Sequence, residues 1–299
     1  MAAPISIEQA FDDCERLATT HYENFSVLSW FLPDRLRPHF SSVYAFCRHT
    51  DDLGDEGAGS PQERLAYLDA WETDLRRCFV VGDQPEHLYL IALRETIQRF
   101  NLPAEPFLRL IEANRIDQRV RRYATYADLL RYCEHSANPV GRLVLMLYGY
   151  RDFERQRCSD AICTALQLTN FWQDVGRDYH ERGRIYLPAE DMARFDYSES
   201  ALARGEATPA FRALIASEVE RARTLFYEGM PLLARLRAFQ RRSVALFALG
   251  GLEILAAIER RNYDVLSRRP TLSRRRKLWL MARVAVAPVA PPGRRRCKQ

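Results

Sequence analysis

The chain has 299 residues, a net charge of +5, 47% hydrophobic and 28% charged residues, a balance typical of globular proteins that bury a substantial core. No run of eighteen apolar residues occurs, and the N-terminus lacks the basic and apolar regions of a secretory signal. Seven cysteines without a C-x-x-C pair indicate reduced thiols. We therefore expect no membrane span, and a cytoplasmic protein.

Clusters of Pro and Gly divide the chain into long segments in which apolar residues recur every three or four positions. One helix face is formed by Leu65, Leu68, Trp71, Leu75 and Phe79. Strand-like alternation is lacking over any useful length. The pattern predicts an all-α protein of about eight to ten helices. We expect one helical domain over 1–270, followed by a basic C-terminal helix and tail over 271–299.

The first candidate site is the stretch YAFCRHTDDLGDE, residues 44–56, which follows an apolar half-helix. In a helix, Tyr44, Arg48, Asp51 and Asp55 share one face. Like charges four residues apart destabilise an isolated helix by a few tenths of a kcal/mol, and a cation between them would reverse that cost. The spacing favours a cation site at Asp51 and Asp55.

A second stretch, LQLTNFWQDVGRDYHERGRIYLP at 166–188, repeats this arrangement. Gln167, Asn170, Asp174 and Asp178 offer oxygen donors on one face, which suit a hard ion such as Mg²⁺, with Mn²⁺ as a substitute. Nearby arginines, among them Arg177, suit phosphate oxygens. Either acidic pair alone is more often solvated helix surface, and an arginine beside it an ion-pair partner. Repetition at one spacing favours a binding site.

With these two motifs the chain resembles the squalene/phytoene synthase family, whose members carry a D-x-x-x-D motif on each of two facing helices. The resemblance runs from about His21 to Arg268 and includes HYENFSVLSWFLP (21–33) and YCEHSANPVGRLVLMLYGY (132–150). It implies an isoprenoid-synthase helical bundle around a central hydrophobic cavity and an isoprenoid diphosphate substrate. The metal ligands that it implies are Asp51, Asp55, Asn170, Asp174 and Asp178. The substrate-binding residues that it implies are His21, Tyr44, Arg48, Arg177, Tyr186 and Arg268.

Three departures from eukaryotic-type squalene synthases bear on the reaction. Tyr22 and Asn24 stand where those enzymes tend to have serines, HSANPVG replaces a small-residue segment, and Gln173 replaces an arginine. They favour an enzyme of squalene and hopanoid biosynthesis that takes presqualene diphosphate from a separate synthase and captures its carbocation with water. The product is then hydroxysqualene, and no NADPH is expected.

The interior of the predicted cavity needs cation-stabilising faces and groups that hold water. Aromatic rings such as Phe25, Tyr44, Phe171 and Tyr132 can stabilise a carbocation, although each ring is more often simply core. The candidates for holding the quenching water are Tyr132, His135, Asn138 and Gln167. We expect Tyr132, Ser136 and 139–140 to lie on a helix that faces the cavity, with a break at Pro139.

Two other functions remain open at this point. One is head-to-head coupling of two prenyl diphosphates to squalene, dehydrosqualene or phytoene. The other is a non-catalytic helical assembly protein, which the four motif aspartates disfavour. Nucleic-acid binding is disfavoured because the last arginine cluster, at 294–296, lies outside the organised region.

The helix predicted near 276–290 fits a peripheral contact at the inner face of the membrane as well as it fits packing on the domain.

Overall fold

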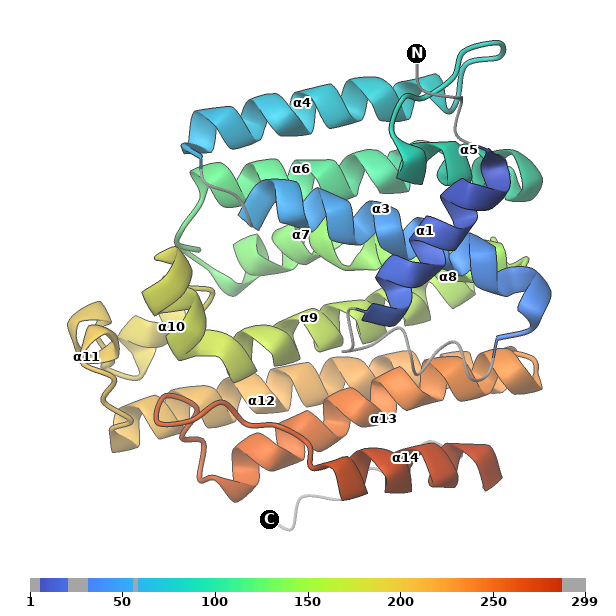
Figure 1. Cartoon of the computed structure of the whole chain (residues 1–299). Coiled ribbons are helices and arrows are strands. Elements are labelled where there is room, and N and C mark those ends of the chain that lie inside the picture. The colour runs from blue at the N-terminus through green and yellow to red at the C-terminus, as the bar shows by residue number, and fades with distance from the viewer. Residues whose placement is uncertain (1–5, 21–31, 56–58, 287–299) are drawn as a thin grey trace. The chain divides into compact units, whose positions relative to one another are not determined.

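The computed structural model describes residues 6–20, 32–55 and 59–286. Regular structure in these ranges is helical (Figure 1), with one isolated bridge between Arg122 and Ile185. The predicted all-α class is confirmed. The described residues form more α-helices than the expected eight to ten. Short helices form over Ala189–Arg194 and Glu199–Ala203, and two helices, Tyr126–Ser136 and Asn138–Leu147, occur where one was expected across 132–140. Backbone contacts group the chain into two compact units, which are described separately; the predicted boundary at 270 remains a prediction.

The first unit comprises residues 1–119 and 139–152, and α3 is its central helix. α3 packs against α1, α4, α5 and α6, and its buried Phe46 stacks on Trp71 and meets the edge of Phe107. The helices of this unit are α1 (Ile7–Thr20), η1 (Asp34–Leu36), α3 (Arg37–Asp55), α4 (Pro61–Arg77), α5 (Leu88–Phe100), α6 (Glu105–Arg119) and α8 (Asn138–Leu147), whose first residue belongs to the other unit.

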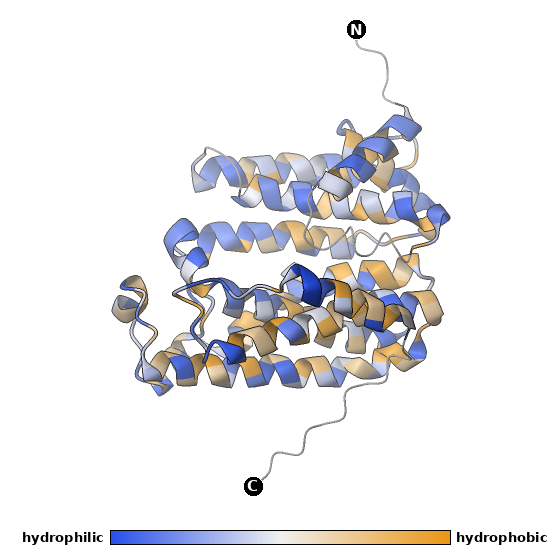
Figure 2. Cartoon of the chain, turned by 60° about the horizontal axis from the view of Figure 1, so that its bottom comes forward, coloured by the Kyte–Doolittle hydropathy of each residue, from blue (hydrophilic) through white to orange (hydrophobic). Residues whose placement is uncertain are grey.

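The second unit comprises residues 120–138 and 153–299 and is built around the 30-residue α9. α9 packs against α7, α12 and α13, and α14 packs on α13. The helices are α7 (Tyr126–Ser136), α9 (Phe153–Arg182), α10 (Ala189–Arg194), α11 (Glu199–Ala203), α12 (Pro209–Gly229), η2 (Met230–Arg235), α13 (Ala238–Arg260) and α14 (Arg274–Val286). Hydrophobic and hydrophilic residues both occur along these helices (Figure 2), as expected for helices that bury one face and expose the other.

Local sequence explains several helix starts. Ser60 with Glu63, and Thr125 with Asp128, form capping boxes at the starts of α4 and α7, which satisfy backbone N–H groups that lack a partner inside the helix.

The six described cysteines are free thiols, four of them buried. No helix in the described ranges is both long and apolar enough to cross a bilayer.

Candidate active site

The first acidic motif occupies the last two turns of α3. The preceding turns carry the buried Phe40, Val43 and Phe46, so packing of the apolar half fixes the direction of the acidic half. On the neighbouring α6, Asn114 Nδ2 donates hydrogen bonds to Asp51 Oδ1 at 3.1 Å and to the Leu110 carbonyl at 3.2 Å. Asn114 therefore orients the first carboxylate of the motif.

The electrostatics around Asp51 disfavour its negative charge. Desolvation raises the pKa of Asp51 to about 7; the Asn114 hydrogen bond and Arg48 lower it, whereas Asp55 and Asp117 raise it. Asp51 nevertheless keeps an exposed surface, through which water offsets part of the desolvation. A cation bound nearby would stabilise the ionised form of this carboxyl, which burial and two neighbouring carboxylates disfavour.

The second acidic motif lies in the last three turns of α9. Arg269 donates two hydrogen bonds to Asp174, from Nε to Oδ1 and from Nη2 to Oδ2, the latter at 3.0 Å. Asp178 is buried and pairs with Arg182 at 3.0 Å. Desolvation raises the pKa of Asp178 to about 6, partly offset by Arg182 and reinforced by Asp174. As at Asp51, neighbouring positive groups only partly compensate the negative charge of the ionised Asp178 carboxylate.

The chain leaves α9 at Gly183, whose φ of 64° is readily adopted only by glycine. The next residues run beside the segment that precedes α7, where the Ile185 N–H donates to the Arg121 carbonyl at 2.9 Å. This pairing places Tyr186 flat against Phe171 of α9, with ring centroids 3.8 Å apart.

Two more tyrosines complete an aromatic cluster. Tyr123 stacks on Tyr186 at 5.8 Å, and Tyr132 lies 6.1 Å from Phe171 and 5.9 Å from Tyr186. All four rings are buried, and Phe171 lies three residues before Asp174. The cluster therefore supplies π-faces next to the second acidic motif, of the kind that stabilise cations.

Two of the residues expected to hold water, His135 and Asn138, lie where α7 ends. The expectation of one helix across 132–140 is wrong, because α7 ends at Ser136 and α8 begins at Asn138; Pro139 cannot donate the backbone hydrogen bond that would continue α7. Asn138 is buried, and its Oδ1 accepts a hydrogen bond from Thr164 Oγ1 at 2.9 Å. Ser136 Oγ and His135 Nδ1 are buried without a hydrogen-bond partner among the described residues.

The donor set suits a magnesium ion that is shared with a substrate. Among the described residues no group of three or more His, Cys, Asp and Glu side chains could hold a metal ion. Each motif instead offers one or two carboxylates, and Mg²⁺ is commonly bound by one or two carboxylates together with substrate phosphates. The raised pKa values of Asp51 and Asp178 fit the same role.

The other predicted site residues in the described ranges lie on α3, on α9 and in the segment before α14. Arg48 on α3 pairs with Asp52 at 2.6 Å, and Arg177 on α9 pairs with Glu181 at 2.8 Å. Burial raises the pKa of Tyr44 on α3. Gln167 and Asn170 lie on α9, half-buried and exposed respectively, and Arg268 is exposed in the segment between α13 and α14. His21, Tyr22, Asn24 and Phe25 lie outside the described residues.

Sequence reasoning missed three residues of the site. Asn114 lies 63 residues from Asp51 and belongs to no acidic motif. Tyr123 joins the aromatic cluster from a loop, and Arg269 rather than its neighbour Arg268 contacts Asp174. Adjacent arginines give no sequence signal of which one reaches the carboxylate. The roles of the predicted residues, and the facing of the two motifs, remain predictions.

Comparisons with known proteins address the class to which this site belongs. A family model for squalene/phytoene synthase matches residues 18–276. The 15-cis-phytoene synthase of Synechococcus elongatus is 34% identical over 285 residues, covering 91% of each chain. The crystal structure of squalene synthase HpnC from Alicyclobacillus acidocaldarius is 50% identical with a TM-score of 0.81, covering 88% of this chain and 97% of that one. A dehydrosqualene synthase solved with a ligand is 29% identical with a TM-score of 0.84, covering 93% and 96%.

The fold and the two acidic motifs thus define a helical synthase that acts on prenyl diphosphates. The chain belongs to the squalene/phytoene synthase family, as the motifs predicted. Enzymes of this family couple prenyl groups head to head, bind isoprenoid diphosphates and use a divalent metal to ionise them. Phytoene, squalene and dehydrosqualene synthases all occur among the similar proteins, so membership alone does not specify the product.

Proposed function

We propose that the chain is a hydroxysqualene synthase of squalene and hopanoid biosynthesis. It takes presqualene diphosphate from a separate synthase, breaks the bond to the diphosphate, rearranges the cyclopropylcarbinyl cation and captures it with water. The observation that carries this proposal is the pair of buried atoms without a partner, His135 Nδ1 and Ser136 Oγ. Buried polar atoms are normally hydrogen-bonded, and an ordered water that bridges such atoms is the usual solution.

One further observation supports the squalene branch over the phytoene branch, and a second supports hydroxysqualene over squalene as the product. The similar structure at 50% identity is named a squalene synthase. Gln173 donates a hydrogen bond to the Pro270 carbonyl, so the position where related squalene synthases tend to carry arginine is neutral here and serves a contact within the chain.

Each group of residues has a defined task in this reaction. Asp51, Asp55, Asn170, Asp174 and Asp178 would hold Mg²⁺, or Mn²⁺ in its place, and the ion would neutralise charge on the leaving diphosphate. His21, Tyr44, Arg48, Arg177, Tyr186 and Arg268 contact the substrate. The aromatic cluster stabilises the cation. Tyr132, Asn138 and Gln167 position the water together with the buried His135 Nδ1 and Ser136 Oγ. The water oxygen forms the new C–O bond and one proton is released, so no hydride from NADPH is consumed.

Product analysis by mass spectrometry tests this proposal. Purified chain with Mg²⁺ and presqualene diphosphate is expected to yield an alcohol without NADPH, and ¹⁸O-labelled water should place its label in that alcohol. A squalene product that forms only with NADPH would overturn the proposal.

The second candidate is coupling of two prenyl diphosphates, and the 34% identity to a 15-cis-phytoene synthase favours it. Incubation with farnesyl diphosphate as the only prenyl substrate, and with geranylgeranyl diphosphate as the only one, each with and without NADPH, distinguishes the two functions. A C30 or C40 hydrocarbon formed from these substrates without added presqualene diphosphate would establish coupling as the activity.

We further propose a peripheral contact between α14 and the inner face of the membrane. Leu280 and Val284 are buried, whereas Leu278 and Trp279 are 62% and 44% exposed. α14 carries no acidic residue, and the Arg276 guanidinium lies 4.2 Å from the centre of the Trp279 ring. A helix that combines exposed apolar groups with basic residues suits an anionic bilayer surface. The tail over 287–299 lies outside the described residues.

A further inference from the structure

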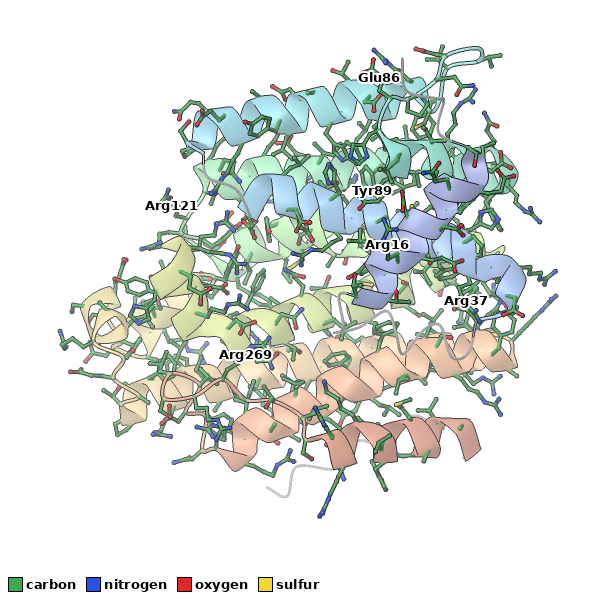
Figure 3. The ribbon with its side chains drawn as sticks, viewed as in Figure 1. Arg16, Arg37, Glu86, Tyr89, Arg121 and Arg269 are labelled. Carbon is green, nitrogen blue, oxygen red and sulfur yellow. The ribbon has the colours of Figure 1, made fainter. Side chains whose placement is uncertain are left out.

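The segment between α13 and α14, residues 261–273, lies against the acidic end of α9 at three successive places. Figure 3 shows Arg269 beside α9, where it bonds to Asp174. One residue further, the Pro270 carbonyl accepts a hydrogen bond from Gln173. Leu266 is the nearest neighbour of Gly176, 3.6 Å from the position that a Cβ would take there. We call residues 261–273 the strap.

The bond between Arg269 and Asp174 uses both oxygens of the carboxylate. A guanidinium that meets a carboxylate with two parallel N–H donors forms one of the stronger polar contacts in proteins. The side chain of Asp174 is only 15% exposed and that of Arg269 is 37% exposed, so solvent screens this pair less than an ordinary surface ion pair. The charge of Asp174 is therefore already neutralised by a side chain of the protein, the Arg269 guanidinium.

A divalent ion at Asp174 requires at least one of the same two oxygens. The bidentate guanidinium already occupies one lone pair on each oxygen. A divalent ion must therefore displace one of its N–H donors or bind at a remaining lone pair, where the positive charge of the guanidinium opposes it. Binding of the ion is therefore expected to weaken the contact that holds Arg269, and with it one of the three contacts described above between the strap and α9.

We propose that Arg269 is the resident counterion of Asp174, and that a divalent cation displaces it and thereby loosens the strap from α9. This inference rests on the proposed function only in taking Asp174 as a metal ligand. Arg269 is on this account a positioning residue: it holds the carboxylate in place before the metal arrives and links metal binding to the segment that leads into α14. The alternative is a permanent ion pair that persists when metal binds.

Metal affinity in the absence of substrate separates these two roles. The full-length chain is titrated with Mn²⁺, with free Mn²⁺ measured by electron paramagnetic resonance, for the wild type, Arg269→Gln and Arg275→Gln. Arg275 is exposed on α14, so its variant removes the same charge without touching Asp174. Removing the competitor is expected to tighten Mn²⁺ binding about three- to tenfold in Arg269→Gln, with Arg275→Gln close to the wild type. Equal or weaker binding by Arg269→Gln than by Arg275→Gln would overturn the proposal.

Hydrogen exchange of the wild-type chain provides a test that needs no Arg269 variant. Saturating Mn²⁺ is expected to speed amide exchange in the strap, and Asp174→Asn should abolish this response. Unchanged or slower exchange in the metal-loaded wild type would show that the strap stays attached. If Asp174→Asn binds Mn²⁺ as the wild type does, the metal assignment of the proposed function is wrong. A different reaction product would leave the strap result intact.

Discussion

Glu218 on α12 is wholly buried, and replacing it with glutamine should make the protein more stable at neutral pH. Arg221 Nη1 donates to Glu218 Oε1 at 3.0 Å, but the same guanidinium also binds both oxygens of the buried Asp191, at 2.5 and 3.0 Å. Desolvation raises the pKa of Glu218 from 4.5 to about 8; Arg221 lowers it and Asp191 raises it. One arginine thus faces two buried carboxyls, and Glu218 retains its proton at neutral pH.

The direction of the pH effect follows from the two pKa values. Below pH 4.5 Glu218 is protonated in both the folded and the unfolded chain, and its contribution to stability is fully present. Between pH 4.5 and about 8 the unfolded chain loses this proton while the folded chain keeps it, so stability falls as pH rises. A linked proton changes the free energy of unfolding by about 1.4 kcal/mol per pH unit, or on the order of 2–3 kcal/mol from pH 5.5 to 7.5.

Thermal unfolding at pH 5.5 and 7.5 tests this reasoning. The glutamine amide needs no proton, so the melting temperature of Glu218→Gln should exceed that of the wild type by roughly 5 °C at pH 7.5, with a much smaller difference at pH 5.5. Glu220→Gln is the matched control, because that side chain is 64% exposed and pairs with Arg223 on the same helix. If Glu218→Gln lowers the melting temperature equally at both pH values, Glu218 is an ionised partner of Arg221 and the reasoning is wrong.

Three further predictions concern the site and the membrane face. Asp51→Asn and Asp174→Asn should each abolish turnover and leave the circular dichroism spectrum unchanged, because each removes charge that a hard cation needs; EDTA should stop the wild-type reaction, and near-normal activity of either variant would refute the metal assignment. Ser136→Ala should lower the alcohol fraction of the product, measured by mass spectrometry, because it removes one of the two buried atoms assigned to the water; an unchanged product distribution would argue against that assignment. Leu278→Glu should weaken co-sedimentation with anionic vesicles several-fold, because it places a negative charge on the proposed membrane face, and sedimentation equal to the wild type at low salt would exclude this face.

The acidic helices could be predicted because their information is local. Apolar residues three and four positions apart fix the buried face of α3, and the position of Asp51 and Asp55 on that helix then follows from the helical repeat. The same reasoning placed Asp174 and Asp178 on α9. The family resemblance was carried by these stretches and is confirmed.

The contacts that orient the carboxylates could not be predicted because they join residues far apart in the chain. Asn114 meets Asp51 across 63 residues, and Arg269 meets Asp174 across 95. Only packing of α6 against α3, and the path of the strap along α9, bring these partners together. Nor did Pro139 reveal its effect in advance: the sequence marks a break there, but not that two separate helices meet at Ala137.

Gly54 links the evolution of two distant positions. It lies between Asp51 and Asp55, and a Cβ at this position would collide with Oδ1 of Asn114, the side chain that donates to Asp51. Lineages that keep asparagine at 114 should therefore be confined to glycine at 54. A side chain at 54 would force the Asn114 side chain to move or to be replaced, and Asp51 would then need another donor. Positions 54 and 114 are expected to change together among relatives, and this paired change would separate subgroups whose acidic motifs are otherwise identical.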